Sequence, residues 1–114
     1  MMKNKPTGQY MDVPFQGHYY MLEDNGTYHC KSCAAPLFSS EHKFHSGSGW
    51  PSFDQAIREA VKVKEPDGRG RKVYCVQCNE FLGLLIQGEG FTKADRRFDI
   101  NSSAIQFKPK PLST

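Results

Sequence analysis

The chain has 114 residues, a formal net charge of +3, and 38% hydrophobic and 24% charged residues, which predicts one globular domain and excludes a disordered chain. This mild charge does not predict a nucleic-acid partner, and no stretch reaches the roughly 18 apolar residues of a membrane span. No apolar run follows the basic start at residues 1–6, so we expect a soluble, cytoplasmic protein. We also expect it to be a monomer. In a reducing compartment its cysteines are expected to bind metal or do redox chemistry instead of forming disulfides.

The first third of the chain predicts an irregular segment and then strands. Residues 1–13 show little hydrophobic periodicity and form the expected lead-in to a domain over residues 14–108. Residues 17–22 are rich in aromatic side chains and precede turn residues at 24–26, which favours a strand. Residues 27–30 predict a second strand that runs into the first cysteine pair.

The rest of the chain predicts one short helix and two more strands. Ser52 is a suitable N-cap for a helix over residues 54–60. Residues 72–76 predict a strand, and residues 104–108 alternate apolar and polar side chains in the period of a half-buried strand. Residues 109–114 are expected to be a frayed tail. The predicted fold class is therefore mainly β.

The four cysteines form two pairs, each with two intervening residues: Cys30 with Cys33 and Cys75 with Cys78. This spacing lets both sulfurs of a turn face one ion, and two such turns complete a tetrahedral shell at about 2.3 Å per bond. Four thiolates select zinc, or less often iron, and leave no open position for substrate. We therefore predict one structural zinc ion per chain; a redox Cys-x-x-Cys is the alternative.

Residues 46–53, Ser-Gly-Ser-Gly-Trp-Pro-Ser-Phe, are the most distinctive stretch. Two glycines allow a sharp turn before Trp50, the only tryptophan, and Pro51 stiffens the exit. Such a segment can hold the indole at the edge of a pocket, or Trp50 can simply be buried in the core.

The cysteine pairs, residues 44–53, the sequence Arg-Phe-Asp-Ile-Asn-Ser at 97–102 and Phe107 together resemble the B-type methionine sulfoxide reductases, the SelR family. The resemblance covers roughly residues 14–108. It implies the β-tent fold, in which two antiparallel sheets surround a four-cysteine zinc knuckle. It also implies reduction of methionine-R-sulfoxide, with Trp50 as one wall of the pocket for the sulfoxide's methyl group.

Three positions depart from the family pattern. Asp99 stands where the family has a catalytic cysteine or selenocysteine, and Phe81 and Leu84 stand where it has two histidines. Sulfoxide reduction needs a polarizable nucleophile that passes through a sulfenic acid, and a carboxylate has no such cycle. Phe81 and Leu84 have no side-chain polar atoms with which to protonate the sulfoxide oxygen.

The leading hypothesis is therefore a zinc-containing family member without reductase activity that keeps its pocket to bind a ligand or peptide. The alternative is an active reductase, which needs one of the four cysteines to be free and to reach the pocket. By resemblance, the residues expected at the pocket are Trp50, Phe81, Leu84, Arg97, Asp99 and Asn101.

The ligand is open among a methionine-sulfoxide-like group, a methylated cation and a protein segment. Aromatic rings near the Asp99 carboxylate would suit a methylated cation. Arg97 and Asp99 lie at alternate strand positions, so they share a face, and Arg97 is the competing partner for this charge. Nucleic acid is not predicted, because the basic residues between 58 and 72 are not interleaved with aromatic side chains.

Overall fold

The computed structural model describes residues 10–65 and 71–111. In these ranges the chain forms β-strands and two short 3-10 helices, and no α-helix. No helix in the described ranges is long and apolar enough to cross a membrane. The elements in chain order are β1 (Gly26–Cys30), β2 (Pro36–Ser39), η1 (Ser40–His42), β3 (Lys43–Phe44), β4 (Ser52–Phe53), β5 (Val61–Lys64), β6 (Arg71–Cys75), β7 (Phe81–Gln87), β8 (Arg96–Ile100), η2 (Ser102–Ala104) and β9 (Ile105–Pro109).

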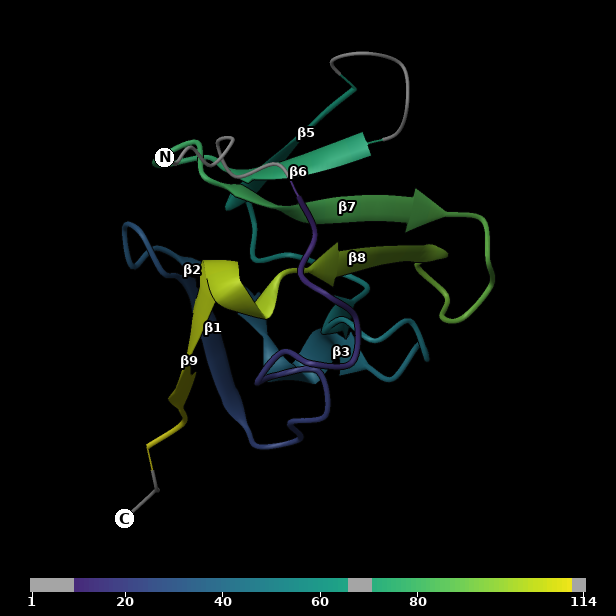
Figure 1. The fold of residues 1–114 in the computed structure, drawn as a ribbon, viewed down its shortest axis with the longest axis horizontal. Helices are drawn as coiled ribbons and strands as arrows, with labels where there is room; N and C mark the ends of the chain where they lie inside the picture. The colour runs from purple at the N-terminus through teal and green to yellow at the C-terminus, as the bar shows by residue number, and fades with distance from the viewer. Residues whose placement is uncertain (1–9, 66–70, 112–114) are drawn as a thin grey trace.

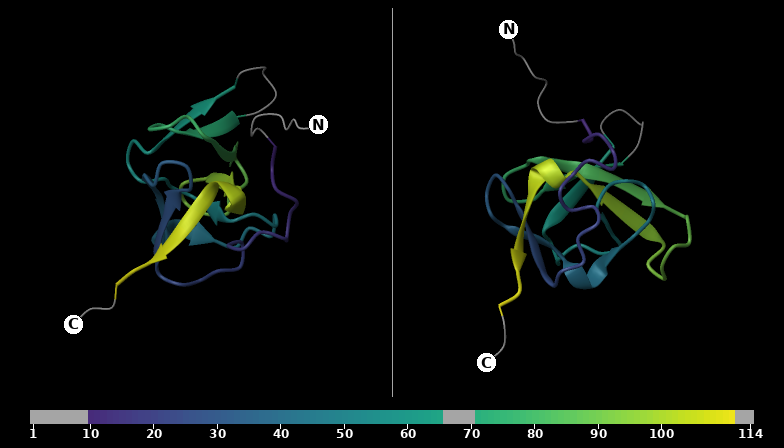
Figure 2. Two further views of the ribbon diagram at one scale, coloured as in Figure 1. Left: turned by 60° about the vertical axis from the view of Figure 1, so that its left-hand side comes forward. Right: turned by 60° about the horizontal axis from the view of Figure 1, so that its bottom comes forward.

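The strands form two antiparallel sheets, as the sequence predicts. One sheet has three strands in the order β2-β1-β9, and the other has six in the order β3-β4-β8-β7-β6-β5. In Figure 1, β5 to β8 run across the upper part of the molecule, and β1, β2 and β9 lie at lower left. Figure 2 shows from two other sides how the strands of the smaller sheet stand at an angle to those of the larger one.

The core lies between the two sheets and is largely aromatic. Strand β1 buries Tyr28 and Cys30 and turns the alternate residues outward, as a strand with one covered face must. The ring of Phe38 stacks on that of Phe53 at 4.5 Å between centroids, which joins β2 to β4 across the sheets. Tyr28 meets the edge of the Phe53 ring at 5.1 Å. Large aromatic side chains are therefore a main part of this core, together with aliphatic residues such as Leu82.

The strands predicted from local pattern near the cysteines and at the end of the chain are confirmed. The segments predicted over 27–30, 72–76 and 104–108 correspond to β1, β6 and β9, within one residue at each end. Strand β9 pairs along its whole length with β1. Near the end of the chain, Pro109 belongs to β9, and Lys110 donates its amide to the carbonyl of Asn25.

The predicted strand over 17–22 and the predicted helix over 54–60 are wrong. Residues 17–22 form bends and turns, and the amide of Tyr19 donates to the Ser102 hydroxyl instead of to a neighbouring strand. Ser52 caps no helix, because it lies in β4 and pairs with β8. Residues 54–60 form turns that include a positive φ of 62° at Glu59. Both errors come from partners distant in sequence, which local propensity cannot reveal.

Candidate functional site

The four cysteines form one compact cluster that joins the two sheets. Their sulfur atoms all lie within 4.8 Å of one another. The Sγ atoms of Cys30 and Cys78 are 3.6 Å apart, as are those of Cys33 and Cys75. Four sulfurs bound tetrahedrally at about 2.3 Å to one ion would be about 3.8 Å apart. The cluster therefore has the size of a four-thiolate metal site.

The two cysteine turns have the same backbone geometry. The amide of Ala34 donates to the carbonyl of Cys30, and the amide of Asn79 donates to that of Cys75, each at 2.8 Å. Ala34 and Asn79 have positive φ angles of 68° and 69°. A left-handed residue after each pair bends the chain back, so both sulfurs of a turn point to the same side. The matching conformations explain why the sulfurs converge.

The Cys30 and Cys33 thiols have opposite electrostatic surroundings. Burial raises the pKa of the Cys30 thiol to about 12. The backbone amide of Ala35 lowers the pKa of the Cys33 thiol. Metal ligation requires thiolates, and the charge of the ion offsets the burial that otherwise keeps Cys30 protonated. The donor set therefore fits a soft or borderline divalent metal ion.

Asp99 lies on the central strands of the larger sheet and is buried, with 2% of its surface exposed. On β8 it is paired with Ser52 of β4 on one side and with Leu84 of β7 on the other. The Ser52 hydroxyl donates to Asp99 Oδ1 at 2.9 Å. Arg97 Nη1 donates to Asp99 Oδ2 in an ion pair. Asp99 therefore has a partner for each carboxylate oxygen.

Arg97 joins this pair to the loop that follows β7. Its Nε and Nη2 donate to the two carboxylate oxygens of Glu89 at 2.8 and 3.0 Å, in a bidentate arrangement. Its guanidinium also lies 5.9 Å from the centre of the Phe91 ring. We call the chain of contacts from Ser52 through Asp99 and Arg97 to Glu89 the Asp99 network. It ties β4, β8 and the β7–β8 loop together.

Burial is the largest influence on the pKa of the Asp99 carboxyl. It raises the pKa of this carboxyl, whereas the Ser52 hydroxyl and the Arg97 guanidinium act in the opposite direction. The neighbouring cation is therefore what permits a charge at a site that water does not reach.

Trp50 and Asn101 bind the backbone of residues 10–12. The indole Nε1 of Trp50 donates to the carbonyl of Asp12 at 2.9 Å. The Asn101 side chain accepts from the Asp12 amide at 2.7 Å and donates to the Tyr10 carbonyl at 2.9 Å. Figure 1 shows this segment, in purple, passing the ends of β7 and β8. Trp50 and Asn101, two of the side chains that the resemblance places at the pocket, are thus engaged by residues 10–12.

Phe81 and Leu84 lie on β7 in different surroundings. Leu84 is directly opposite Asp99 across the β7–β8 ladder. Phe81 is buried, and its ring meets that of Tyr74 on β6 at 5.7 Å. The structure therefore brings Leu84, Arg97 and Asp99 together, and Trp50 lies next to them through Ser52, whose hydroxyl oxygen is 3.1 Å from the Trp50 carbonyl oxygen.

Sequence reasoning missed Ser52, Glu89 and Asp12 as partners in this region. Ser52 was assigned to a helix cap, although it contacts a residue 47 positions away. Glu89 contacts Arg97 from the β7–β8 loop, and no local sequence pattern indicates this contact.

Two antiparallel sheets joined by a four-cysteine cluster define a β domain with a site that could hold a metal ion. The family model of the SelR domain matches residues 5–109. The chain therefore belongs to the SelR domain family.

Several curated relatives are methionine sulfoxide reductases. Peptide methionine sulfoxide reductase B9 of Arabidopsis thaliana is 45% identical over 81% of this chain and 66% of its own length. Peptide methionine sulfoxide reductase MsrB of Thioalkalivibrio sulfidiphilus is 43% identical over 85% of this chain and 73% of its own. Methionine-R-sulfoxide reductase B2, mitochondrial, of Danio rerio is 40% identical over 87% and 61%. The chain thus spans between about three fifths and three quarters of these relatives.

We expect Arg97→Met to destabilise the fold by about 3 kcal/mol at pH 7, because it leaves the buried Asp99 carboxylate without its cation. Without Arg97, the folded-state pKa of Asp99 lies further above its unfolded value of about 3.9. Protonation then favours the folded state, so the loss is small near pH 4 and grows as pH rises through the folded-state pKa. Urea unfolding at several pH values measures this.

Arg96→Met is the matched control for this test. Arg96 is exposed, donates to the backbone carbonyl of Asp54, and forms no ion pair with another described residue. Its loss should cost about 1 kcal/mol or less at every pH. If both variants lost the same free energy of unfolding at every pH, this result would contradict the role assigned to Arg97.

Proposed function

We propose that this protein is a SelR-family domain that retains a structural zinc ion and has lost methionine-R-sulfoxide reductase activity. One observation carries the proposal: the residue at the family's nucleophile position, Asp99, is 2% exposed and is held by Ser52 and Arg97. A buried, ion-paired carboxylate links strands β4 and β8, and both of its oxygens already have partners, so neither is available to a substrate.

The chemistry of the reaction supports this proposal. In sulfoxide reduction a thiolate attacks sulfur, the sulfoxide oxygen passes to the thiol as a sulfenic acid, and an external thiol reduces this to water and a disulfide. An aspartate can neither form a sulfenic acid nor be regenerated by a thiol. Leu84, directly opposite Asp99, offers no proton to a sulfoxide oxygen.

The cysteine cluster supports the zinc assignment. The cluster includes all four cysteines of the chain. Four thiolates at tetrahedral spacing suit zinc, and with a closed shell the ion supplies folding energy and no open coordination position. Because such thiols must stay reduced to bind metal, we propose that the protein works in a reducing compartment, the cytoplasm.

For the retained pocket we propose an apolar partner, such as the methionine side chain of a protein segment. Leu84, directly opposite Asp99, replaces a family histidine and makes this face less polar. A methylated cation has less support, because Arg97 already neutralises the Asp99 charge.

An active reductase is the second candidate function, and one observation favours it: Cys78 is exposed. Activity by this route would require Cys78 to leave the cluster and act as the nucleophile. Its sulfur lies 3.6 Å from that of Cys30, within the cluster.

Restoring the missing groups separates the two candidates. Asp99→Cys alone should recover little activity on methionine-R-sulfoxide with a dithiol reductant. Adding Phe81→His and Leu84→His should raise the turnover of this variant by about 100-fold, the usual contribution of general acid–base catalysis.

The matched control carries Asp99→Ser with the same two histidines and should show no turnover, because serine has no redox cycle. If the serine control turns over the sulfoxide as fast as the cysteine-containing triple variant, the nucleophile is another residue and the proposal fails. The proposal also fails if the unmodified chain turns over the sulfoxide as fast as that triple variant.

A further inference from the structure

A polar hollow of about 510 Å³ lies on the face of the three-stranded sheet that points away from the core. Strand β1 turns Tyr28 and Cys30 inward, so Thr27 and His29 face outward into this hollow. The ends of β2 and β9, together with η1, complete its walls. No residue of the Asp99 network lines this hollow.

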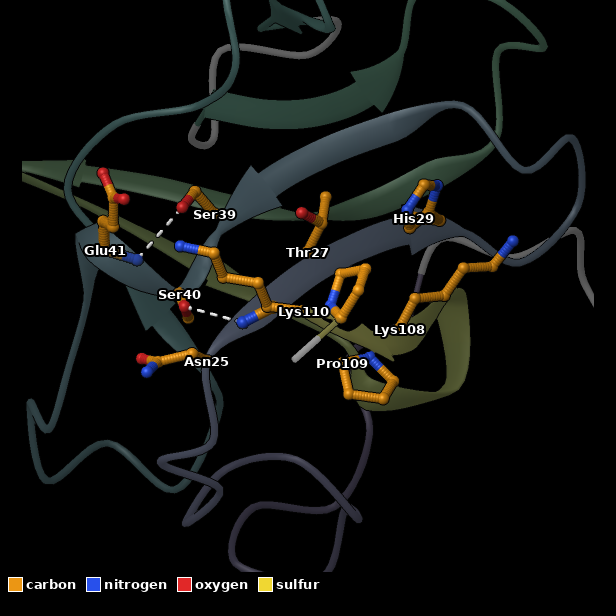
Figure 3. A pocket seen from close by; sticks show the side chains of 11 residues that line it. Asn25, Thr27, His29, Ser39, Ser40, Glu41, Lys108, Pro109 and Lys110 are labelled. Atoms are coloured by element: carbon orange, nitrogen blue, oxygen red, sulfur yellow. Dashed lines mark hydrogen bonds between the residues drawn. The ribbon is translucent and has the colours of Figure 1, made fainter. Parts of the chain in front are cut away.

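Strand register places hydrogen-bond donors side by side across the floor of this hollow. Thr27 is paired with Ser39 on β2 and with Lys108 on β9, so the three side chains form one row across the sheet. His29 follows two residues further along β1, with Nδ1 directed to the Ala34 carbonyl at 2.9 Å. That contact makes Nδ1 the donor and leaves Nε2 for other partners. Figure 3 shows the row with His29 at one end.

Two lysines without carboxylate partners supply the charge. Among the described residues, neither Lys108 nor Lys110 has an ion-pair partner. In Figure 3 the Lys110 side chain extends towards Ser39, and the Lys108 side chain extends in the opposite direction. Glu41 is the one carboxylate among the described lining residues. With two lysines and one carboxylate, the lining of the hollow has a net positive charge, which attracts anions.

We propose that this hollow binds a small multivalent oxyanion, a phosphate or a polycarboxylate. Lysine ammonium groups bind such anions as point charges, and the Thr27 and Ser39 hydroxyls add directional donors. The volume lies within the range of small-molecule sites, so the anion can be part of a larger organic ligand. The Glu41 carboxylate repels an anion, so its removal is expected to strengthen binding, whereas removal of the lysines is expected to weaken it.

NMR titration of the ¹⁵N-labelled full chain with inorganic phosphate, and separately with citrate, tests the proposal. Sodium chloride holds the ionic strength constant, since screening weakens any surface charge interaction. We expect saturable shifts at Gly26, Thr27 and Ser39. Lys108→Gln with Lys110→Gln should raise Kd at least about tenfold, and Glu41→Gln should lower Kd about threefold.

The control is Lys93→Gln, which removes one positive charge from an exposed site on the β7–β8 loop. It should change Kd by less than about twofold. Binding of phosphate alone identifies a phosphate site, and binding of both probes identifies a general oxyanion site. No saturable shift, shifts outside the hollow, or an equal loss in the double variant and in Lys93→Gln would overturn the proposal.

Discussion

Replacement of Cys75 by serine is expected to leave the domain unfolded at 25 °C. Cys75 is fully buried in the cysteine cluster. Structural zinc in small domains binds with an apparent free energy of about 10–16 kcal/mol, which is comparable to or larger than the usual stability of a domain. Removing one of the four ligands is expected to remove much of this binding free energy. Far-UV circular dichroism and the dispersion of the NMR spectrum measure the result.

Val76→Ser is the matched control, because Val76 is next in sequence and 48% exposed. This variant should remain folded and keep about one zinc ion per chain. Excess chelator should unfold the unmodified chain to the same state as Cys75→Ser. A metal-free chain that stays fully folded with four reactive thiols would contradict the structural role of the metal.

Gly83→Ala is the second large expected effect, with a loss of about 3 kcal/mol or more. Gly83 faces Ile100 across the β7–β8 ladder. A Cβ at this position would overlap the carbonyl oxygen of Asp99 and lie 2.9 Å from the Ile100 Cα. These are backbone atoms of a central strand, so no side-chain rotation can relieve the overlap. Thermal and urea unfolding measure the loss.

The control for this substitution is Gly88→Ala in the β7–β8 loop. Gly88 has a positive φ of 86°, and a Cβ there would meet nothing within 4 Å. The cost should therefore be the backbone penalty alone, about 1 kcal/mol. Equal losses in the two alanine variants would show that close packing of β7 on β8 is not the reason for glycine at position 83.

Local sequence patterns predicted the parts of the fold that depend on neighbouring residues. The spacing of Cys30, Cys33, Cys75 and Cys78 predicted one cluster, because two-residue gaps fix the direction of the sulfurs within each turn. Alternation predicted β9, which has one buried face. The segment 17–22 has strand-like composition but no partner strand, and only the tertiary structure determines that.

The candidate site was predictable to a similar extent. Alternate positions on one strand indicated Arg97 as the competing partner of Asp99, and the structure contains this ion pair. The contacts of Ser52 and Glu89 with this pair were not predictable, because they depend on the pairing of β4 with β8 and on the path of the β7–β8 loop. Resemblance located the position of Asp99 in the family pattern, and the structure gave its partners.

The most direct test of the lost activity is turnover of a methionine-R-sulfoxide peptide by the unmodified, zinc-loaded chain with a dithiol reductant. The ion pair of Asp99 with Arg97, and the placement of all four cysteines in the cluster, predict a rate equal to that of buffer. The Asp99→Cys/Phe81→His/Leu84→His variant serves as the positive comparison in the same assay. Turnover by the unmodified chain that scales with its concentration and disappears when its thiols are alkylated would contradict the account.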